Sequence, residues 1–148
     1  MEYAACNITM YGKCREAVEF YEKSFLIEEK TILTFGDVAE RLNFGDFVQG
    51  QEKLIYQAKL FFPCKSGKFL LMMGDSPSIL FKEGPMGNCK DNITINIGCS
   101  AQEELLNIYE RLSEGGKNNI RPRLNNEQIF EGSLIDRFGI CWILRAEE

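Results

Sequence analysis

Three polar side chains at a spacing of two residues are the first candidates for binding chemistry. Asn92, Thr94 and Asn96 alternate with three isoleucines in the stretch Asn-Ile-Thr-Ile-Asn-Ile-Gly. Because successive side chains of a β-strand point to opposite faces, this stretch predicts a strand with one apolar and one polar face. The amide and hydroxyl groups could hydrogen-bond the polar groups of a small ligand in an otherwise apolar pocket. The polar face could also face solvent, so both interpretations stay open.

The chain contains no histidine, which narrows the possible chemistry. Imidazole is the commonest metal ligand in proteins and the usual general base near neutral pH. Serine or cysteine triads of the usual type are therefore excluded. A catalytic metal ion would have to be held by carboxylates, thiolates and amides alone.

Six cysteines stand at positions 6, 14, 64, 89, 99 and 141, and no two of them form a Cys-x-x-Cys pair. Structural zinc sites use such close pairs, so none is expected. Disulfides are also not expected in a domain of this size, which can hold itself together by its core. Cys141 would need an imidazole or a nearby cation to become a nucleophile. We therefore expect ordinary free thiols.

Composition places the chain among ordinary globular proteins. It has 148 residues, 45% hydrophobic and 26% charged, enough for one compact domain. The formal net charge is −5, and lysine and arginine form no block, so a nucleic-acid partner is not expected. No apolar run approaches the roughly 18 residues of a membrane helix, and the N-terminus lacks a signal pattern. We expect a cytoplasmic protein without a membrane partner.

The first half of the chain predicts strand, helix and then three further strands. Residues 14–25 carry apolar side chains at the spacing of one helical face. Residues 35–37 predict a turn, and residues 38–50 an irregular excursion that could include a short helix or strand. The predicted strands are residues 4–11, 28–34, 54–62 and 68–73, the last two an antiparallel pair joined by Pro-Cys-Lys-Ser-Gly.

The second half repeats this order after a linker at about residues 76–90, which is rich in Gly, Pro and Ser. Ser100 and Glu103 predict a capping box for a helix that ends near Glu114, before Gly115-Gly116. The predicted strands are 92–98, 118–124, 128–135 and 140–144, the last two joined by a turn at Asp136-Arg-Phe-Gly139. The helical segments 16–23 and 104–111 also align, which indicates an internal duplication.

A duplicated unit of this kind resembles the vicinal oxygen chelate superfamily, which includes glyoxalases, extradiol dioxygenases and bleomycin-resistance proteins. Within it the chain resembles the PhnB-like, demethylubiquinone methyltransferase-like branch. The segments that carry the resemblance are Gly12-Lys-Cys-Arg-Glu-Ala-Val-Glu-Phe-Tyr21, Thr34-Phe-Gly-Asp37, Met72-Met-Gly-Asp75, Leu112-Ser-Glu-Gly-Gly-Lys117 and Gly132-Ser-Leu-Ile-Asp-Arg-Phe-Gly-Ile-Cys-Trp142. The sequence has no Gly-rich strand-to-helix turn for the nucleotide-like cofactor of a methyltransferase.

The resemblance implies an α+β fold in which two βαβββ modules form a curled mixed sheet around a cleft. A single domain would cover residues 1–148, with one module at about 1–75 and the other at about 91–148. The resemblance also implies a homodimer, because modules of this superfamily commonly pair across subunits.

The resemblance further implies where a metal ion would be held: by one residue on the first strand and one on the last strand of each module. The matching positions here are Cys6 or Asn7, then Met72, then Asn92, Thr94 or Asn96, and finally Ile143. None is a histidine or a carboxylate. A divalent ion in a cleft needs hard oxygen or imidazole donors, so we expect no metal and no cofactor.

The cleft would be lined by the polar side chains on one face of the first strand of each module and by the residues on either side of the sole tryptophan. We expect Trp142 in the core, which turns its neighbours Cys141 and Ile143 towards the cleft. On the first strand we favour Asn7 and Thr9 as cleft residues, although the helix alignment favours the opposite parity. Candidate ligand-binding residues are Asn7, Thr9, Asn92, Thr94, Asn96, Cys141 and Ile143.

Three functions remain open at this point. The first is metal-independent binding of a small molecule in the cleft. The second is a metal-dependent enzyme of the glyoxalase or dioxygenase type, and the third is a resistance protein that sequesters a drug. Arg121 and Arg123, which should share a strand face around Pro122, could receive an anionic ligand, but exposed arginines also commonly protect edge strands. Neither the ligand nor whether a reaction is catalysed follows from these residues.

Overall fold

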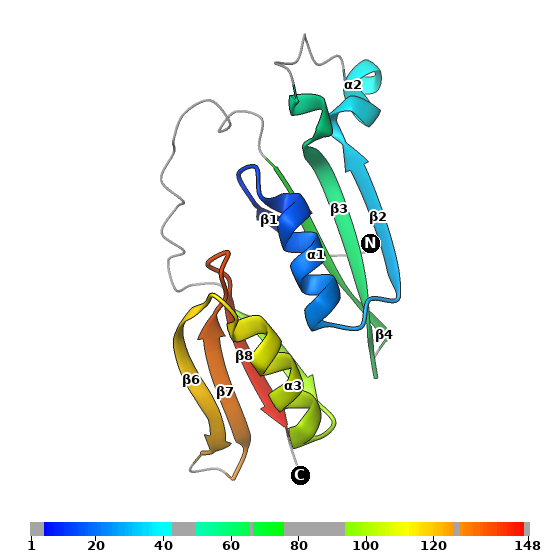
Figure 1. Ribbon diagram of the computed structural model, residues 1–148. Coiled ribbons are helices and arrows are strands. Elements are labelled where there is room, and N and C mark those ends of the chain that lie inside the picture. The colour runs from blue at the N-terminus through cyan, green and yellow to red at the C-terminus, as the bar shows by residue number, and fades with distance from the viewer. Residues whose placement is uncertain (1–4, 43–49, 66, 76–93, 126–127, 147–148) are drawn as a thin grey trace. The chain divides into compact units, whose positions relative to one another are not determined.

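The computed structural model describes residues 5–42, 50–65, 67–75, 94–125 and 128–146 (Figure 1). The chain divides into two compact units, Met1–Gly84 and Pro85–Glu148. The first unit contains β1 (Cys6–Thr9), α1 (Cys14–Ser24), β2 (Glu29–Thr34), α2 (Phe35–Leu42), the short 3₁₀ helix η1 (Gln51–Lys53), β3 (Ile55–Cys64) and β4 (Gly67–Gly74). The second contains β5 (Ile95–Cys99), α3 (Gln102–Ser113), β6 (Lys117–Leu124), β7 (Phe130–Ile135) and β8 (Cys141–Ala146).

Each unit has its own four-stranded sheet, and the two sheets have the same topology. Sheet A has the order β1-β4-β3-β2, and sheet B has the order β5-β8-β7-β6. In both sheets the first strand pairs in parallel with the last, and the other neighbours are antiparallel. The predicted α+β fold of two βαβββ modules is thereby confirmed.

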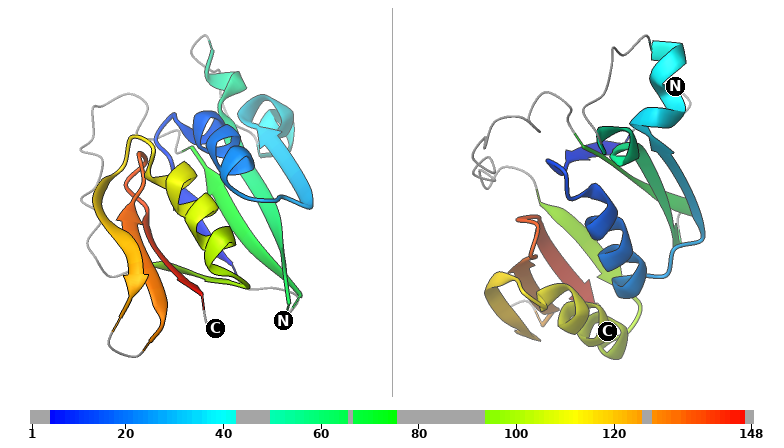
Figure 2. Two further views of the ribbon diagram at one scale, coloured as in Figure 1. Left: turned by 60° about the horizontal axis from the view of Figure 1, so that its bottom comes forward. Right: turned by 45° about the horizontal axis from the view of Figure 1, so that its top comes forward.

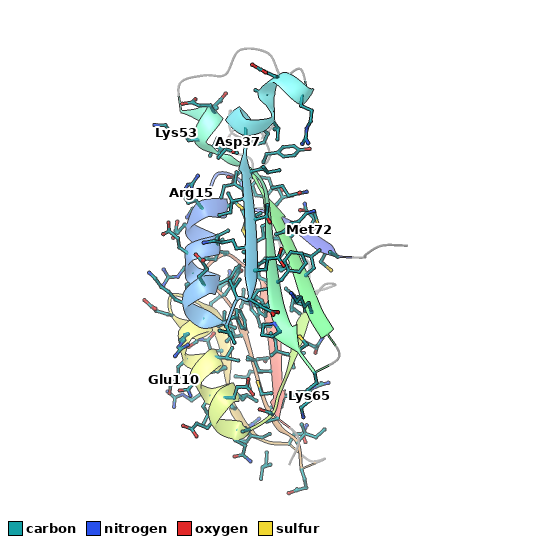
Figure 3. All side chains as sticks on the ribbon, turned by 90° about the vertical axis from the view of Figure 1, so that its right-hand side faces the viewer. Arg15, Asp37, Lys53, Lys65, Met72 and Glu110 are labelled. Carbon is teal, nitrogen blue, oxygen red and sulfur yellow. The ribbon has the colours of Figure 1, made fainter. Side chains whose placement is uncertain are left out.

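The core of the first unit lies between α1 and one face of sheet A. Ala17, Val18 and Tyr21 are fully buried at the helical spacing that the sequence predicts. Leu60 and Leu71 are paired across β3 and β4 and are also fully buried. Figure 3 shows Met72, the next residue of β4, pointing to the side of the sheet away from α1. The alternation along β4 therefore separates a helix-covered face from a helix-free face.

The second unit buries α3 against sheet B in the same manner, and Figure 2 shows α3 along one face of the sheet. Leu105 and Leu112 of the helix are fully buried. On β8, Trp142 and Leu144 are 1% and 0% exposed. The prediction that Trp142 belongs to the core is confirmed.

Asp75 ties three elements of the first unit together. Its Oδ1 accepts hydrogen bonds from the backbone N–H groups of Gly12 (2.7 Å) and Cys14 (3.0 Å), and its Oδ2 accepts from Ile55 N–H (3.1 Å). The residue before α1, Lys13, contributes no side-chain cap. The first N–H groups of a helix have no partner within the helix, so a carboxylate there both satisfies them and meets the positive end of the helix dipole. Asp75 caps α1 from a distant strand.

Two helix starts differ from the sequence prediction. The predicted turn at residues 35–37 is the first turn of α2, because Thr34 and Asp37 form a reciprocal cap: Thr34 donates through N–H and Oγ1 to Asp37 Oδ2, and Asp37 N–H donates to Thr34 Oγ1. Ahead of α3, Ser100 donates through N–H and Oγ to Glu104, not to the predicted Glu103. The helix begins one residue later than Ser100 would place it, at Gln102.

Strand β6 is irregular, and this overturns the prediction that Arg121 and Arg123 share a face. The register against β7 shifts on both sides of Ile120, so three residues of β6 span the distance of two on β7. Arg123 pairs with Glu131. Arg121 instead comes close enough to Tyr109 of α3 for its charge to act on the pKa of that phenol, which burial raises.

Glycine is required at position 132 of β7, which faces Pro122 of β6. A Cβ atom there would lie 2.7 Å from Cγ of Pro122. Other signals of the sequence are confirmed: Gly115 ends α3 with a φ of 72°, and Gly139, with a φ of 83°, closes the hairpin turn after Asp136. The predicted linker at residues 76–90 and most of residues 38–50 lie outside the described residues. Within the described ranges, no helix is long and apolar enough to cross a membrane.

Candidate functional site

Each unit has its own candidate surface, the helix-free face of its sheet, which the strand register defines. On sheet A the helix-free face contains a row of directly paired residues: Asn7 of β1, Met72 of β4, Lys59 of β3 and Thr31 of β2. Paired residues point to the same side of a sheet, and Figure 3 shows that side for Met72. Half-buried Phe61 and Leu70 form the neighbouring row. The face is amphipathic.

Sheet B presents an equivalent row on its own helix-free face. Asn96 of β5 pairs with Ile143 of β8, which pairs with Ser133 of β7, which pairs with Ile120 of β6. Asn96 is exposed, Ile143 and Ser133 are half-buried, and Ile120 is 55% exposed. An amide, a hydroxyl and two branched apolar side chains thus lie side by side.

The other candidate residues that the structure describes lie on the same faces as these rows. Asn7 and Thr9 share the helix-free parity of sheet A and are both exposed. Cys141 pairs with Ile135 on the helix-free face of sheet B, and half-buried Thr94 precedes β5 in the parity of Asn96. Asn92 lies outside the described residues. Whether any of these side chains contacts a ligand stays a prediction.

The register resolves the conflict between the two parities of the first strand. The alignment of the helices would match Cys6 with Thr94, whereas the strand pairing matches Asn7 with Asn96, since each is the direct partner of a residue on the last strand of its unit. The first residue of α1 comes seven residues after Asn7, whereas the first residue of α3 comes six residues after Asn96. An alignment of the helices alone therefore gives the wrong face for β1.

Charged side chains form a second row on the helix-free face of sheet B. Arg145 of β8 forms an ion pair with Glu131 of β7, and Arg123 of β6 is the direct partner of Glu131 on the other side. In the strand order, Glu131 therefore stands between two arginines and is ion-paired with Arg145. No local pattern singles out Arg145 or Glu131, because only the pairing of β7 with β8 brings them together.

Two of the described cysteines, Cys14 and Cys99, are buried on the helix side of their units. Burial raises the pKa of Cys14 to about 12, with a further contribution from the charge of Asp75. Burial raises the pKa of Cys99 to about 11, with a further contribution from Glu104. Both side chains lie on the helix side of their sheets, and both stay protonated at neutral pH. The chain contains no histidine that could activate Cys141, and the partner of Cys141 on β7 is Ile135, which carries no charge.

The residues at the metal-ligand positions of the superfamily do not fit a divalent ion. The structure places Asn7 beside Met72 and Asn96 beside Ile143, which are the first-strand and last-strand positions of each unit. Two amides, a thioether and an aliphatic side chain do not make a closed set of hard donors. Among the described residues, no three Cys, Asp or Glu side chains gather as a group that could hold a metal ion.

Solved structures share this architecture over nearly the whole chain. Protein PA1353 from Pseudomonas aeruginosa superimposes with a TM-score of 0.73 at 23% identity, covering 99% of this chain and 98% of its own. A PhnB protein from Bacillus cereus gives a TM-score of 0.69 at 17% identity, covering 99% and 100%. The chain has the glyoxalase-like fold. The fold that the resemblance implies is thereby confirmed.

A third structure with the glyoxalase-like fold is a bleomycin-binding protein complexed with bleomycin. Its TM-score is 0.51 at 14% identity, and the match covers 100% of both chains. No protein-family model and no curated protein sequence matches the chain. The glyoxalase-like fold therefore stands on structural likeness and on the duplicated topology together.

Proposed function

We propose that this protein binds a small apolar or amphipathic molecule on the helix-free faces of its sheets, without a metal ion, as a PhnB-like member of the vicinal oxygen chelate superfamily. The donor set at the four ligand positions carries this proposal. Asn7, Met72, Asn96 and Ile143 offer hydrogen bonds and apolar contact but no hard anionic donor. The bleomycin-binding neighbour, which has the same fold, supports the small-molecule part.

The composition of the two faces supports the same proposal. Phe61, Leu70 and Met72 are half-buried on sheet A, as are Ile135 and Ile143 on sheet B. Apolar side chains with a few amides and hydroxyls among them are the usual lining of small-molecule sites. The proposal includes a homodimer and a cytoplasmic location, and light scattering would give about twice the mass of 16.9 kDa for the dimer.

The first test is elemental analysis of protein purified without chelator or affinity tag, together with thermal unfolding in the presence of Ni²⁺, Zn²⁺, Mn²⁺ and Fe²⁺. We expect no stoichiometric metal and no shift in melting temperature. One metal ion per chain, with the stabilisation that mass action requires, would contradict the metal-free proposal and favour a metal-dependent enzyme.

The second test measures binding of the neutral fluorescent probe N-phenyl-1-naphthylamine. Met72→Gln should weaken probe binding several-fold, because it replaces an apolar contact on the helix-free face of sheet A. Leu106→Gln is the matched control, since Leu106 is 40% exposed on α3. Equal effects of the two substitutions, or no probe binding by the unaltered protein, would contradict the proposed location.

A further inference from the structure

We infer that the ligand of the helix-free face of sheet B is an anion: an amphipathic molecule with a carboxylate or similar head group. This inference rests on the proposed function and names the ligand class of the same site. The inference is based on the charge of this face, which is opposite in sign to the net charge of the whole chain. The chain carries a formal net charge of −5, yet this face is rich in cations.

The cations lie along one end of the face and at one corner. Arg145 and Arg123 flank Glu131 in a single transverse row, and Lys117 pairs with Ile135 at the other end of β6. Acidic side chains of this unit also lie on α3, where Glu103, Glu104 and Glu110 are all exposed.

Arg123 is the guanidinium that a ligand would meet. Glu131 already pairs with Arg145 through the Nε atom of that residue. Among the described residues, Arg123 has no ion-pair partner, and it is exposed. A planar guanidinium presents a fork of donors that matches a carboxylate, and such charge-assisted hydrogen bonds are the stronger ones.

The rest of the face suits the remainder of such a molecule. Successive rows on one face of a sheet lie about 7 Å apart. The row next to the arginines contains Asn96, Ile143 and Ser133, and the row beyond it contains Cys141 and Ile135. A head group at Arg123 would therefore be followed by polar anchors and then by apolar contacts. A cationic drug would meet charge of its own sign.

The test is displacement of N-phenyl-1-naphthylamine by three ligands of equal chain length: octanoate, 1-octanol and octylammonium. We expect octanoate to displace the probe at the lowest concentration and octylammonium at the highest. Added salt should narrow the difference, because the charges involved are partly exposed. Arg123→Gln should weaken octanoate about tenfold, the effect of losing a hydrogen bond to a charged group, and leave 1-octanol unchanged. Arg123→Lys should have a smaller effect.

Arg121→Gln is the matched control. Arg121 is also an exposed arginine of β6, but it falls within the register shift between Ile120 and Arg123 and has no direct partner on β7, and its charge acts on the pKa of Tyr109. We expect octanoate binding to Arg121→Gln to equal that of the unaltered protein. If both substitutions weaken octanoate equally, the effect is long-range charge and the assignment to Arg123 is overturned.

Other outcomes separate this inference from the proposed function. Displacement by 1-octanol with equal or better displacement by octylammonium would overturn the anion and leave small-molecule binding intact. Failure of all three ligands would contradict both. A change in oligomer mass on Arg123→Gln, measured by light scattering, with octanoate binding unaltered would assign the arginine to an interface between copies and overturn the inference.

Discussion

Asp136 is a buried carboxylate whose two oxygen atoms serve different donors. Oδ1 accepts from the backbone N–H groups of Phe138 (2.9 Å) and Ile140 (3.0 Å), which shapes the last hairpin turn. Oδ2 accepts from Nε1 of Trp142 at 2.9 Å. Only a group that accepts on both sides satisfies all three donors, so the turn and the core tryptophan are fixed by one side chain.

Asp136→Asn should destabilise the protein by about 1–3 kcal/mol, because the new amide N–H₂ must face a donor on one side. Chemical denaturation followed by far-UV circular dichroism measures the change in every variant, including one that lacks Trp142, the sole tryptophan. If the new amide N–H₂ faces the indole N–H of Trp142, then Asp136→Asn should destabilise the Trp142→Phe variant less than it destabilises the unaltered protein. A purely additive double variant would argue against that account.

The thiols should differ strongly in reactivity. Cys6 and Cys64 are exposed, whereas burial raises the pKa of Cys14 to about 12 and that of Cys99 to about 11. Iodoacetamide attacks the thiolate, so at pH 8 we expect rapid modification of the exposed pair and slow modification of the buried pair. Mass spectrometry of the peptides reads this out, and denatured protein is the control in which the difference should vanish. Early modification of Cys14 would contradict its burial.

The sequence predicts the position of a single residue well when that residue type has one strong structural preference. A lone tryptophan in an alternating strand belongs to the core, and Trp142 is 1% exposed. Residues whose role depends on a neighbour strand are not found this way. Glu131 and Arg145 are fourteen residues apart and meet only through the β7–β8 register, for which neither residue gives a local signal.

Helix α2 shows how a cap determines an element. The pKa of Asp37 is lowered from its ordinary value of 3.8, chiefly by the hydrogen bond from Thr34 N–H and then by that from the Thr34 hydroxyl. A carboxyl group whose pKa is lower in the folded state stabilises that state above the unfolded pKa. The contribution is lost as pH falls through the lower, folded value.

We therefore expect the first turn of α2 to lose protection as pH falls below about 3.8, more than the turns of α1 do. Amide hydrogen exchange followed by NMR measures this. Asp37→Asn should show reduced protection already at neutral pH and no further loss on acidification. If acid affects α2 equally in the variant and in the unaltered protein, the cap is not the cause.

Two of the element-scale errors have different physical origins. Thr34-Phe-Gly-Asp37 has the composition of a turn. The reciprocal hydrogen bonds between Thr34 and Asp37 make these residues the start of a helix, so the local sequence is compatible with both structures. In β6 the register shifts around Ile120 arise from packing against β7 and cannot be seen in a strictly alternating pattern. Periodicity locates elements well, but it does not locate irregularities within them.

At the scale of the whole molecule, the charge predicts solubility. The formal net charge is −5 at pH 7 and the isoelectric point is about 5.0. Repulsion between molecules is weakest where the net charge vanishes, so solubility in polyethylene glycol should be lowest near pH 5. Arg123→Gln, which removes one positive charge, should shift the minimum slightly to lower pH. A minimum above pH 6 would contradict this charge balance.

The fold is predictable at this scale because many weak signals occur in the right order. Residues Gly115-Gly116 and the turn from Asp136 to Gly139 fall where the duplicated topology needs them, and both act as predicted. The candidate site is less predictable. Its faces follow from parity, but its chemistry depends on which side chains stand in line across four strands, and that order is a tertiary property.

The capping of α1 by Asp75 also bears on how the chain is made. Gly12 and Cys14 lie 63 and 61 residues before the carboxylate that satisfies their N–H groups. During synthesis the helix leaves the ribosome long before Asp75 does, and its first turn stays uncapped in that interval. A nascent chain that stops before residue 75 should hold α1 only loosely, and the first unit should become resistant to protease as a whole once Asp75 has emerged.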